Sequence, residues 1–284
     1  MTTEISDVRR LRAAQRDMAA ESVSHTSSPL PLAEYHPDPG DLEELSARFE
    51  GAHPREILAW AFEYIPDLAI GTSFQLGGLV NIFLAREVVD PVRVLFLETG
   101  FHFPETLEFR DRLVDNWGLE MMNTTPTLGP ERQAKEIHPE LYRVDPDQCC
   151  YLNKVLPMEA ALESLGGWAT GVRRDQSPTR LNTNIFEVQE LTSGKVIWKV
   201  NPQAHWTRAQ VEEFVRQHDI PTHPLYEQGY ISIGCAPCTR PVSADEDERS
   251  GRWDGFDKAE CGIHTNGNGS GDAKALPLSV RARA

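Results

Sequence analysis

Four of the five cysteines form two pairs that lie far apart in the sequence, Cys149-Cys150 and Cys235-x-x-Cys238. The second pair lies in a glycine- and proline-containing segment, 233–238, which has the composition of a turn rather than of an apolar periodic face. Buried core cysteines would be expected on periodic apolar segments instead. The two pairs therefore predict one four-thiolate site, and the fold must bring both segments together to form it.

The adjacency of Cys149 and Cys150 bears on what the four thiolates bind. A structural zinc ion requires four ligands that converge on one point, and side chains of adjacent residues converge poorly. In a 4Fe-4S cluster each thiolate binds a different iron, so neighbouring cysteines can both be ligands. We therefore predict one 4Fe-4S cluster rather than zinc, and a disulfide is the weakest interpretation.

Composition and charge exclude several classes of function. The N-terminal residues lack the basic segment and apolar core of a secretion signal, and no apolar run approaches the roughly 18 residues that span a bilayer. We expect a cytoplasmic protein without a membrane partner. The chain has 28 Lys+Arg against 43 Asp+Glu, a formal net charge of −15. Nucleic acid is therefore not expected as a partner, because it requires clustered basic residues.

Three parts of the 284-residue chain differ in composition. Residues 1–40, with a short helical pattern at 8–20, resemble a flexible arm, and residues 265–284 form a glycine- and asparagine-rich tail without apolar periodicity. The working domain is predicted at 41–264. Helix-start signals at Asp41 and Pro54 predict two short helices before its core.

Strand and helix patterns alternate in the first half of this domain. Apolar strands are predicted at 67–70 and 93–97, with amphipathic helices around 79–84 and 104–117. This order predicts an α/β fold: a mostly parallel sheet with helices on both faces and a ligand crevice at the carboxyl ends of its strands. Further predicted elements are a strand end at 168–171, a hairpin of 186–189 and 196–200, and a capped helix after Thr207.

Three features of this acidic chain suit a small anion. The glycine-bearing turn 71–78 follows a strand and opens a helix, where free backbone N–H groups can bind phosphate or sulfate. Three arginines occur within 171–180, and two more within 249–252. Cys261 follows them on a glycine-flanked segment, and its spacing alone leaves both a surface thiol and a mobile nucleophile open. Together these features suggest a doubly anionic ligand that faces a thiol.

Residues 65–264 resemble the family of assimilatory adenylyl-sulfate and phosphoadenylyl-sulfate reductases. The matching motifs occur in one order: Thr99-Gly100 with Pro104-Glu105-Thr106, Gly171 to Arg180, Asn201-Pro202 with Trp206-Thr207, Gly229-Tyr230, Ser232 to Pro241, and Glu260-Cys261-Gly262-Ile263-His264.

The resemblance implies a fold, an activity and partners. The fold is that of the adenine nucleotide alpha-hydrolases, with a diverged PP-loop. The activity is thioredoxin-dependent reduction of adenylyl sulfate (APS) to sulfite and AMP in sulfate assimilation and cysteine biosynthesis, through an enzyme S-sulfocysteine. Members with both cysteine pairs bind a 4Fe-4S cluster and mostly use APS. Thioredoxin or a similar redoxin is the implied partner, and a homo-oligomer is expected because members are often dimers or tetramers.

The resemblance also assigns roles to residues. Cys261 is the nucleophile, Cys149, Cys150, Cys235 and Cys238 bind the cluster, and Lys154 links cluster and substrate electrostatically. The family usually has arginine where this chain has Asn153. The expected substrate-binding residues are Ser73, Phe74, Lys154, Gly171, Arg173, Arg174, Arg180, Arg249, Arg252 and His264.

Three alternatives remain at this point. Reduction of 3′-phosphoadenylyl sulfate (PAPS) is the nearest one. An ATP-using relative that adenylates its substrate is disfavoured, because the loop Ser73 to Gly78 lacks the Ser-Gly-Gly pattern of ATP-cleaving relatives. A non-catalytic iron-sulfur redox sensor would explain four cysteines but would leave Cys261 and the arginines unused.

Overall fold

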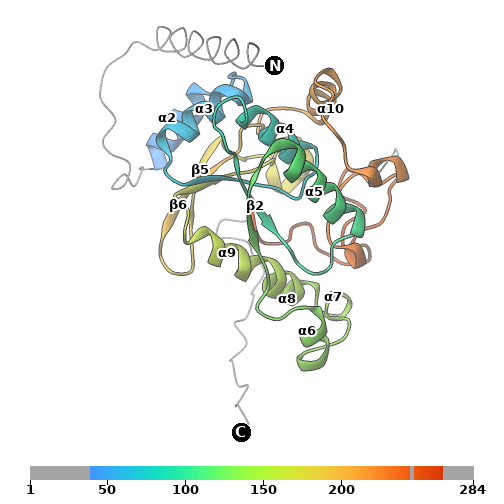
Figure 1. Ribbon diagram of the computed structural model, residues 1–284. Helices are drawn as coiled ribbons and strands as arrows, with labels where there is room; N and C mark the ends of the chain where they lie inside the picture. Colours follow the sequence, from blue (N-terminus) through green and yellow to red (C-terminus); the bar gives the residue numbers. More distant parts are fainter. Residues whose placement is uncertain (1–38, 244–245, 265–284) are drawn as a thin grey trace. The chain divides into compact units, whose positions relative to one another are not determined.

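The computed structural model describes residues 39–243 and 246–264 of the chain (Figure 1). The predicted helical pattern at 8–20 and the predicted tail 265–284 lie outside the described residues. Helices α2 (Pro39–Arg48) and α3 (Pro54–Tyr64) confirm the two helices expected before the core. The first begins slightly before Asp41, because proline is favoured in a first helical turn.

Six strands form one sheet in the order β3-β2-β1-β4-β6-β5. All neighbouring strands run parallel except β5 and β6, which form the predicted antiparallel hairpin. The mostly parallel sheet is therefore confirmed. The strands are β1 (Leu68–Gly71), β2 (Arg93–Leu97), β3 (Glu120–Thr124), β4 (Gly167–Ala169), β5 (Phe186–Glu190) and β6 (Val196–Val200).

Helices connect the parallel strands and cover both faces of the sheet. α4 (Leu76–Ala85) joins β1 to β2, and α5 (Pro104–Trp117) joins β2 to β3, at the positions that periodicity predicts. The other helices are α6 (Pro130–Glu136), α7 (Leu141–Val144), α8 (Pro146–Cys150), α9 (Leu156–Leu162) and α10 (Arg208–Gln217). A π-helical turn at Tyr151–Val155 joins α8 to α9, and single 3-10 turns occur at Arg174–Gln176, Pro178–Arg180, Pro224–Gln228 and Ala236–Cys238.

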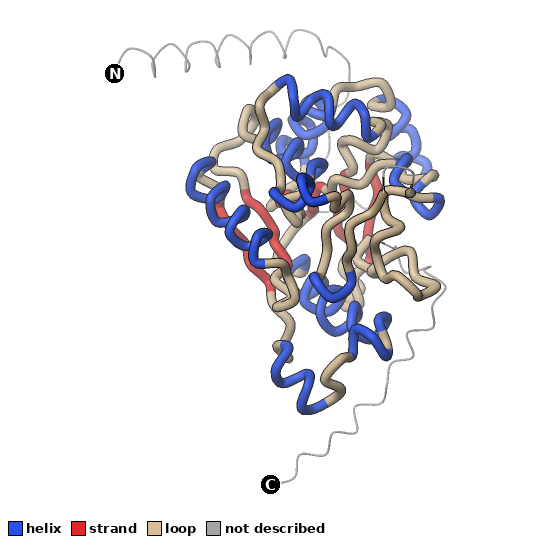
Figure 2. The backbone as a smooth tube through the Cα atoms, turned by 90° about the vertical axis from the view of Figure 1, so that its right-hand side faces the viewer, coloured by secondary structure: helices blue, strands red, loops and turns tan. Residues whose placement is uncertain are grey.

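The packing of α9 identifies one face of the sheet. Met158 and Leu162 of α9 form a buried cluster with strand residues that include Ala69, Leu95 and Trp168, and Ile263 packs against the same cluster. In Figure 1, α4 and α5 lie on the opposite face, above the sheet, whereas α9 lies below it. Figures 1 and 2 both place α6 and α7 beyond α8, at the lower end of the picture. The predicted helices on both faces are thus confirmed.

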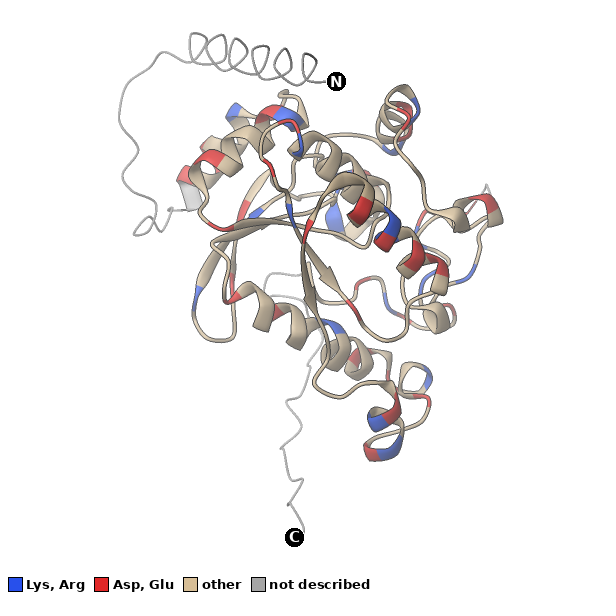
Figure 3. Cartoon of the chain, viewed as in Figure 1, with Lys and Arg blue, Asp and Glu red and all other residues tan. Residues whose placement is uncertain are grey.

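Charged residues are distributed over the helices, and α2 and α5 carry conspicuous acidic residues (Figure 3). Among the described helices, none is long and apolar enough to cross a membrane. The loops after β1, β2 and β4 all leave the sheet at one edge, because the carboxyl ends of parallel strands meet there. That edge holds the site described next.

Candidate functional site

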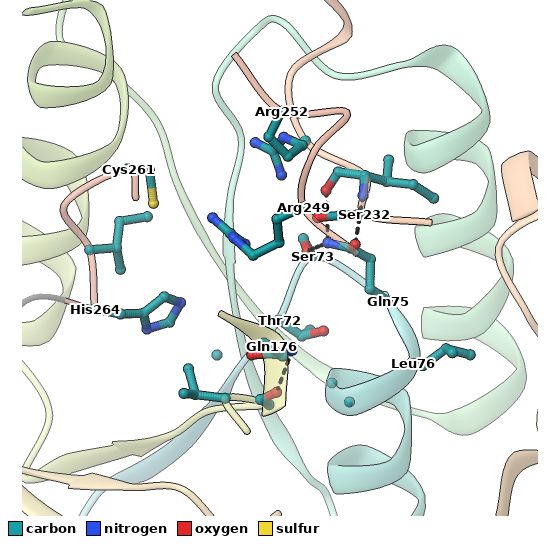
Figure 4. A pocket seen from close by; sticks show the side chains of 18 of the residues that line it. Thr72, Ser73, Gln75, Leu76, Gln176, Ser232, Arg249, Arg252, Cys261 and His264 are labelled. Carbon is teal, nitrogen blue, oxygen red and sulfur yellow. Dashed lines mark hydrogen bonds between the residues drawn. The ribbon is translucent and has the colours of Figure 1, made fainter. Parts of the chain in front are cut away.

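A pocket of about 220 Å³ lies at the carboxyl ends of β1, β2 and β4, where the sequence predicts the ligand crevice. Its walls come from the turn 71–78, the loop after β4 and the segment 248–264. Figure 4 shows Cys261 and His264 on one side and Ser73 and Gln75 on the other, with Arg249 between them. The order of strands changes direction at β1, so this is also the position at which open α/β sheets bind ligands.

The turn after β1 presents backbone to the pocket. Its Thr72 hydroxyl accepts a hydrogen bond from the Phe74 amide at 2.8 Å, and Phe74 has a φ of +56°. The Phe74 ring does not line the pocket, because it is fully buried and packs 5.8 Å from the Phe96 ring. Ser73 does line the pocket. Of these two predicted substrate-binding residues, only Ser73 therefore has its side chain at the site.

Two glycines let this turn approach the loop after β4. A Cβ on Gly77 would lie 2.8 Å from the Gly171 carbonyl oxygen, and a Cβ on Gly171 would lie 2.8 Å from the Gly77 carbonyl carbon. Neither position has room for a side chain. Gly171, a predicted site residue, thus lines the pocket and permits the close contact that forms it.

Gln75 connects the turn to the second cysteine segment. Its amide nitrogen donates to the Ile233 carbonyl and its amide oxygen accepts from the Ile233 N–H, both at 2.7 Å. Ile233 precedes Cys235 by two residues. The anion-binding turn and the Cys235 segment are therefore joined by two direct hydrogen bonds.

The three arginines of 171–180 have different positions. Arg173 lines the pocket and pairs with Asp175 and Glu248, each at 2.9 Å. Arg180 also lines the pocket. Arg174 does not, because its side chain pairs with Glu50 outside the pocket, with Nη2 at 2.9 Å from Oε2. The structure thus brings two of the three predicted arginines to the site.

Trp253 is surrounded by basic side chains. Arg252 lies 4.7 Å from its ring centroid, Arg249 5.7 Å and Lys154 5.9 Å. Lys258 contacts the same ring at 5.4 Å. The indole face stabilises cations at such distances. A cationic wall is thus held together around one buried tryptophan.

Several polar atoms of this wall have no partner. Among the described residues, six buried side-chain N or O atoms lack a hydrogen bond, and four of them belong to residues that line the pocket: Arg249 Nε, Arg252 Nε, Trp253 Nε1 and His264 Nδ1. Buried polar atoms are nearly always paired, so such a concentration requires an explanation. A ligand that accepts hydrogen bonds, such as an oxyanion, would supply the missing partners.

Cys261 is partly buried and lines the pocket. Burial would raise the pKa of its thiol, but Lys154, the Ile263 N–H and Arg249 outweigh this effect and lower the pKa below its ordinary value. His264 stacks on Trp168, with centroids 5.4 Å apart and ring planes within 8°. Burial, with Arg180 and Lys199 nearby, holds the pKa of His264 well below its ordinary value. The site therefore combines an activated thiol with a neutral imidazole.

The structure brings the two cysteine pairs together, as the sequence requires. Cys149 and Cys150 end α8, Cys235 and Cys238 flank a 3-10 turn, and all four are free thiols. Burial, then Cys150 and Cys235, raises the pKa of Cys149 to about 12; burial and Cys235 raise that of Cys238 to about 11. Burial and the neighbouring sulfurs therefore oppose ionisation of Cys149 and Cys238.

In the described ranges, no three His, Cys, Asp or Glu side chains are placed to hold a single metal ion. Lys154 interacts electrostatically with Cys150, Cys235 and Cys261. Burial alone would lower its pKa, but Cys235, Cys261 and Cys150 outweigh burial and raise it, so the amine is charged.

A comparison with known families identifies the family of this chain. A sequence model described as "Phosphoadenosine phosphosulfate reductase domain" matches residues 67–241. The chain belongs to this reductase family. The resemblance stated from the motifs is thereby confirmed.

Relatives in the family cover most of the chain. A protein named adenosine 5′-phosphosulfate reductase from Staphylococcus haemolyticus is 40% identical over 74% of this chain and 86% of its own. One of the same name from Streptomyces coelicolor is 42% identical over 78% of this chain and 92% of its own.

Solved structures support the same fold. Phosphoadenylyl-sulfate (PAPS) reductase from Candida auris, as a phosphate complex, has a TM-score of 0.63 and 28% identity over 72% of this chain and 98% of that one. FMN adenylyltransferase from Candida glabrata has a TM-score of 0.53 at 13% identity, over 80% of each chain, and is alike in fold alone. The predicted fold class is confirmed.

Sequence reasoning missed three residues of this reductase site. These residues are Gln75, Trp253 and Glu260, none of which is among the predicted site residues. Glu260 had no distinguishing signal, because it is one of several acidic residues that surround Arg249 and Arg252 in the sequence. Gln75 and Trp253 act through contacts that only the fold reveals.

Proposed function

We propose that the protein reduces adenylyl sulfate to sulfite and AMP, with electrons from thioredoxin or a similar redoxin. As an oxidoreductase acting on a sulfur group, it would serve sulfate assimilation and cysteine biosynthesis. The names of its relatives support the substrate. The observation that carries the proposal is the Cys261 thiol in a pocket where the Arg249 Nε, Arg252 Nε and Trp253 Nε1 atoms lack hydrogen-bond partners.

In the first step the Cys261 thiolate attacks the sulfur of adenylyl sulfate. A sulfur–sulfur bond forms, the bond from sulfur to the bridging oxygen breaks, and AMP leaves with the electron pair. Cys261 then carries an S-sulfonate. The lowered pKa of Cys261 supplies the thiolate without a separate general base.

The basic residues stabilise the charge that moves in this step. Arg249 and Arg252 face the pocket with unpaired nitrogens, which suits the sulfonyl and phosphate oxygens. Lys154 is charged and close enough to Cys261 to lower the pKa of that thiol. Backbone N–H groups at the start of α4 would receive the phosphate.

In the second step a thiolate of the redoxin attacks the Cys261 sulfur and sulfite leaves. A second redoxin thiol resolves the mixed disulfide, so the dithiol is oxidised by two electrons and Cys261 is restored. Reduced redoxins are cytoplasmic, which is the location we propose.

The four cysteines Cys149, Cys150, Cys235 and Cys238 would hold a 4Fe-4S cluster. When bound, the cluster would supply fixed charge and a covalent connection between α8 and the Cys235 segment rather than electrons. Asn153 donates to the Cys149 sulfur at 3.4 Å and Thr99 Oγ1 lies 3.5 Å from the Cys235 sulfur, contacts that suit thiolate ligands.

The proposal is tested by incubating anaerobically purified protein with adenylyl sulfate and, separately, with its 3′-phosphorylated form. Peptide mass spectrometry then locates any adduct. We expect a sulfonate on Cys261 that forms faster with adenylyl sulfate and disappears with reduced thioredoxin. The Cys261→Ser variant, with its cluster absorbance intact, should release no sulfite.

The other outcomes are equally informative. Faster adduct formation with the 3′-phosphorylated substrate would assign the protein to PAPS reduction. Absence of any adduct in protein that retains iron would contradict the proposal and favour a redox sensor, while pyrophosphate release with ATP would favour the adenylating alternative.

A further inference from the structure

Glu260, the residue before Cys261, is paired with two arginines of the pocket. Its two carboxylate oxygens accept hydrogen bonds from Arg180 Nε and Nη2, each at 2.7 Å. Arg249 Nη2 lies 3.3 Å from the same carboxylate. The fork-to-fork geometry with Arg180 is the strongest form of such a pair, and the Glu260 side chain is only 12% exposed.

Glu260 acts on these arginines from outside the pocket. Arg180 and Arg249 both line the cavity, whereas Glu260 does not. Burial would raise the pKa of Glu260, but hydrogen bonding and charge from Arg180, with Arg249, outweigh burial and lower it. The carboxylate is therefore ionised. It orients both guanidinium groups without occupying the space that a substrate would fill.

The rest of the segment is held at further points. Arg249 Nη2 donates to the Ala259 carbonyl oxygen at 2.9 Å. Lys258 pairs with Asp147 of α8, beside the first cysteine pair. The Lys199 amine donates to the His264 carbonyl oxygen at 3.1 Å and to Glu187 at 2.8 Å. Among the side chains of this segment, that of Glu260 is adjacent to the thiol and pairs with two arginines that line the pocket.

We propose that Glu260 is a positioning residue for the transfer step: its carboxylate ties Arg180 and Arg249 to the segment that carries Cys261. This inference rests on the proposed function. The arginines and the thiol then approach the substrate as one unit, with the guanidinium groups at its oxygens and the thiol at its sulfur. An error of about 1 Å in such an alignment can cost on the order of 100-fold in rate.

The pKa of Cys261 distinguishes a positioning role of Glu260 from a purely electrostatic one. By charge alone, Glu260 raises the pKa of Cys261, as would any nearby carboxylate. Its neutralisation would then lower that pKa. If Glu260 holds the segment in place, its neutralisation lets Cys261 move away from Lys154 and Arg249, and the pKa rises. The sign of the change separates the two roles.

The experiment compares Glu260→Gln, Glu260→Asp and a control, Glu246→Gln, in the full-length protein with its iron content measured. Glu246 pairs with Arg240 at 2.8 Å, and neither residue lines the pocket. Three quantities are determined: the affinity for AMP, the rate of Cys261 sulfonation at saturating adenylyl sulfate, and the rate of Cys261 alkylation by iodoacetamide as a function of pH.

We expect Glu260→Gln to lower the saturated sulfonation rate on the order of 100-fold and to move the alkylation profile to higher pH. The loss of AMP affinity should be smaller than the loss of rate. Glu260→Asp should recover part of the rate, and Glu246→Gln should match the wild type. A saturated rate within about twofold of wild type, or an alkylation profile that stays in place or moves to lower pH, would overturn the proposal.

The alkylation measurement requires no substrate. It therefore tests Glu260 even where wild-type protein forms no adduct with adenylyl sulfate, a result that would overturn the proposed function alone.

Discussion

The side-chain amide of Asn153 donates a hydrogen bond to the Cys149 sulfur at 3.4 Å, and a second one to the Cys149 carbonyl at 2.9 Å. Gln133 holds this amide in orientation through a reciprocal pair of 3.2 Å contacts. Asn153 thus supplies a neutral hydrogen-bond donor to Cys149, which we propose as a cluster ligand.

We predict that Asn153→Ala weakens iron retention. A hydrogen bond to a charged sulfur contributes roughly 1.5–3 kcal/mol, so transfer of iron to a chelator should become at least about 10-fold faster. Iron and acid-labile sulfide analysis would measure it. Asn182→Ala, on an exposed turn, serves as the control. Equal iron loss in both variants would show that the Asn153 contact does not stabilise the cluster.

Lys154→Met should make Cys261 less reactive. The change removes the positive charge that lowers the pKa of Cys261, so the pH profile of Cys261 alkylation should move upward. The loss of one charge-stabilising group predicts a decrease in sulfonation rate on the order of 100-fold. Lys154→Arg, which keeps the charge, should retain more of the rate. An unshifted profile with an unchanged rate would remove Lys154 from the mechanism.

His223 should make the fold sensitive to acid. Burial lowers the pKa of His223 to about 4. In its buried position, Nδ1 of His223 accepts a hydrogen bond from the Leu225 N–H, and Nε2 lies 2.9 Å from the Thr106 hydroxyl. In the unfolded chain, His223 takes up a proton near pH 6.5. The contribution of neutral His223 to the free energy of unfolding is therefore fully present above that pH and is lost as the pH falls towards 4. Between pH 6.5 and 5 the loss is roughly 2 kcal/mol.

Urea unfolding of anaerobic protein at pH 7 and pH 5 measures this contribution. His223→Asn should be less stable than wild type at pH 7 but should lose less stability between the two pH values. His138→Gln, at a surface loop, should keep the wild-type dependence. The same loss in His223→Asn as in wild type would show that another group is responsible.

Gly77→Ala should damage the anion site. The added methyl group would lie 2.8 Å from the Gly171 carbonyl oxygen, so backbone must move on one side of the pocket. Overpacking of this kind costs roughly 1–3 kcal/mol, which predicts at least about 5-fold weaker AMP binding if the strain is carried by the nucleotide-binding conformation. Gly51→Ala, where nothing lies within 4 Å, is the matched control for calorimetry. AMP affinity equal to that of the control would contradict the close-contact argument.

Much of the fold follows from local pattern. β2 and α5 occur at the predicted residues, because an uninterrupted apolar run and a proline-led amphipathic segment each have one good structural solution. β3 was not predicted, since it is an edge strand whose Glu120 and Asn123 are exposed and whose two methionines are only half-buried. The π-helical turn after Cys150 has no local signal either.

The candidate site was predictable where chemistry is concentrated in short motifs. Of the residues predicted from such motifs, Ser73, Cys261, Gly171 and four of the five arginines line one pocket. The side chains of Phe74 and Arg174 do not line this pocket. The Phe74 ring packs against the buried Phe96 ring, and Arg174 pairs with Glu50 outside the pocket. The homo-oligomer stays a prediction, since one chain does not reveal which surfaces associate.

The two hydrogen bonds between Gln75 and Ile233 have a thermodynamic consequence. They join the turn 71–78 to the segment that carries Cys235. In the proposed holoprotein, a nucleotide that orders the turn would also favour the iron-binding arrangement of that segment. Reciprocity then requires the nucleotide to strengthen iron binding by the same factor by which iron strengthens nucleotide binding. Substrate supply would thus protect the cluster, and the enzyme would be most durable while it is in use.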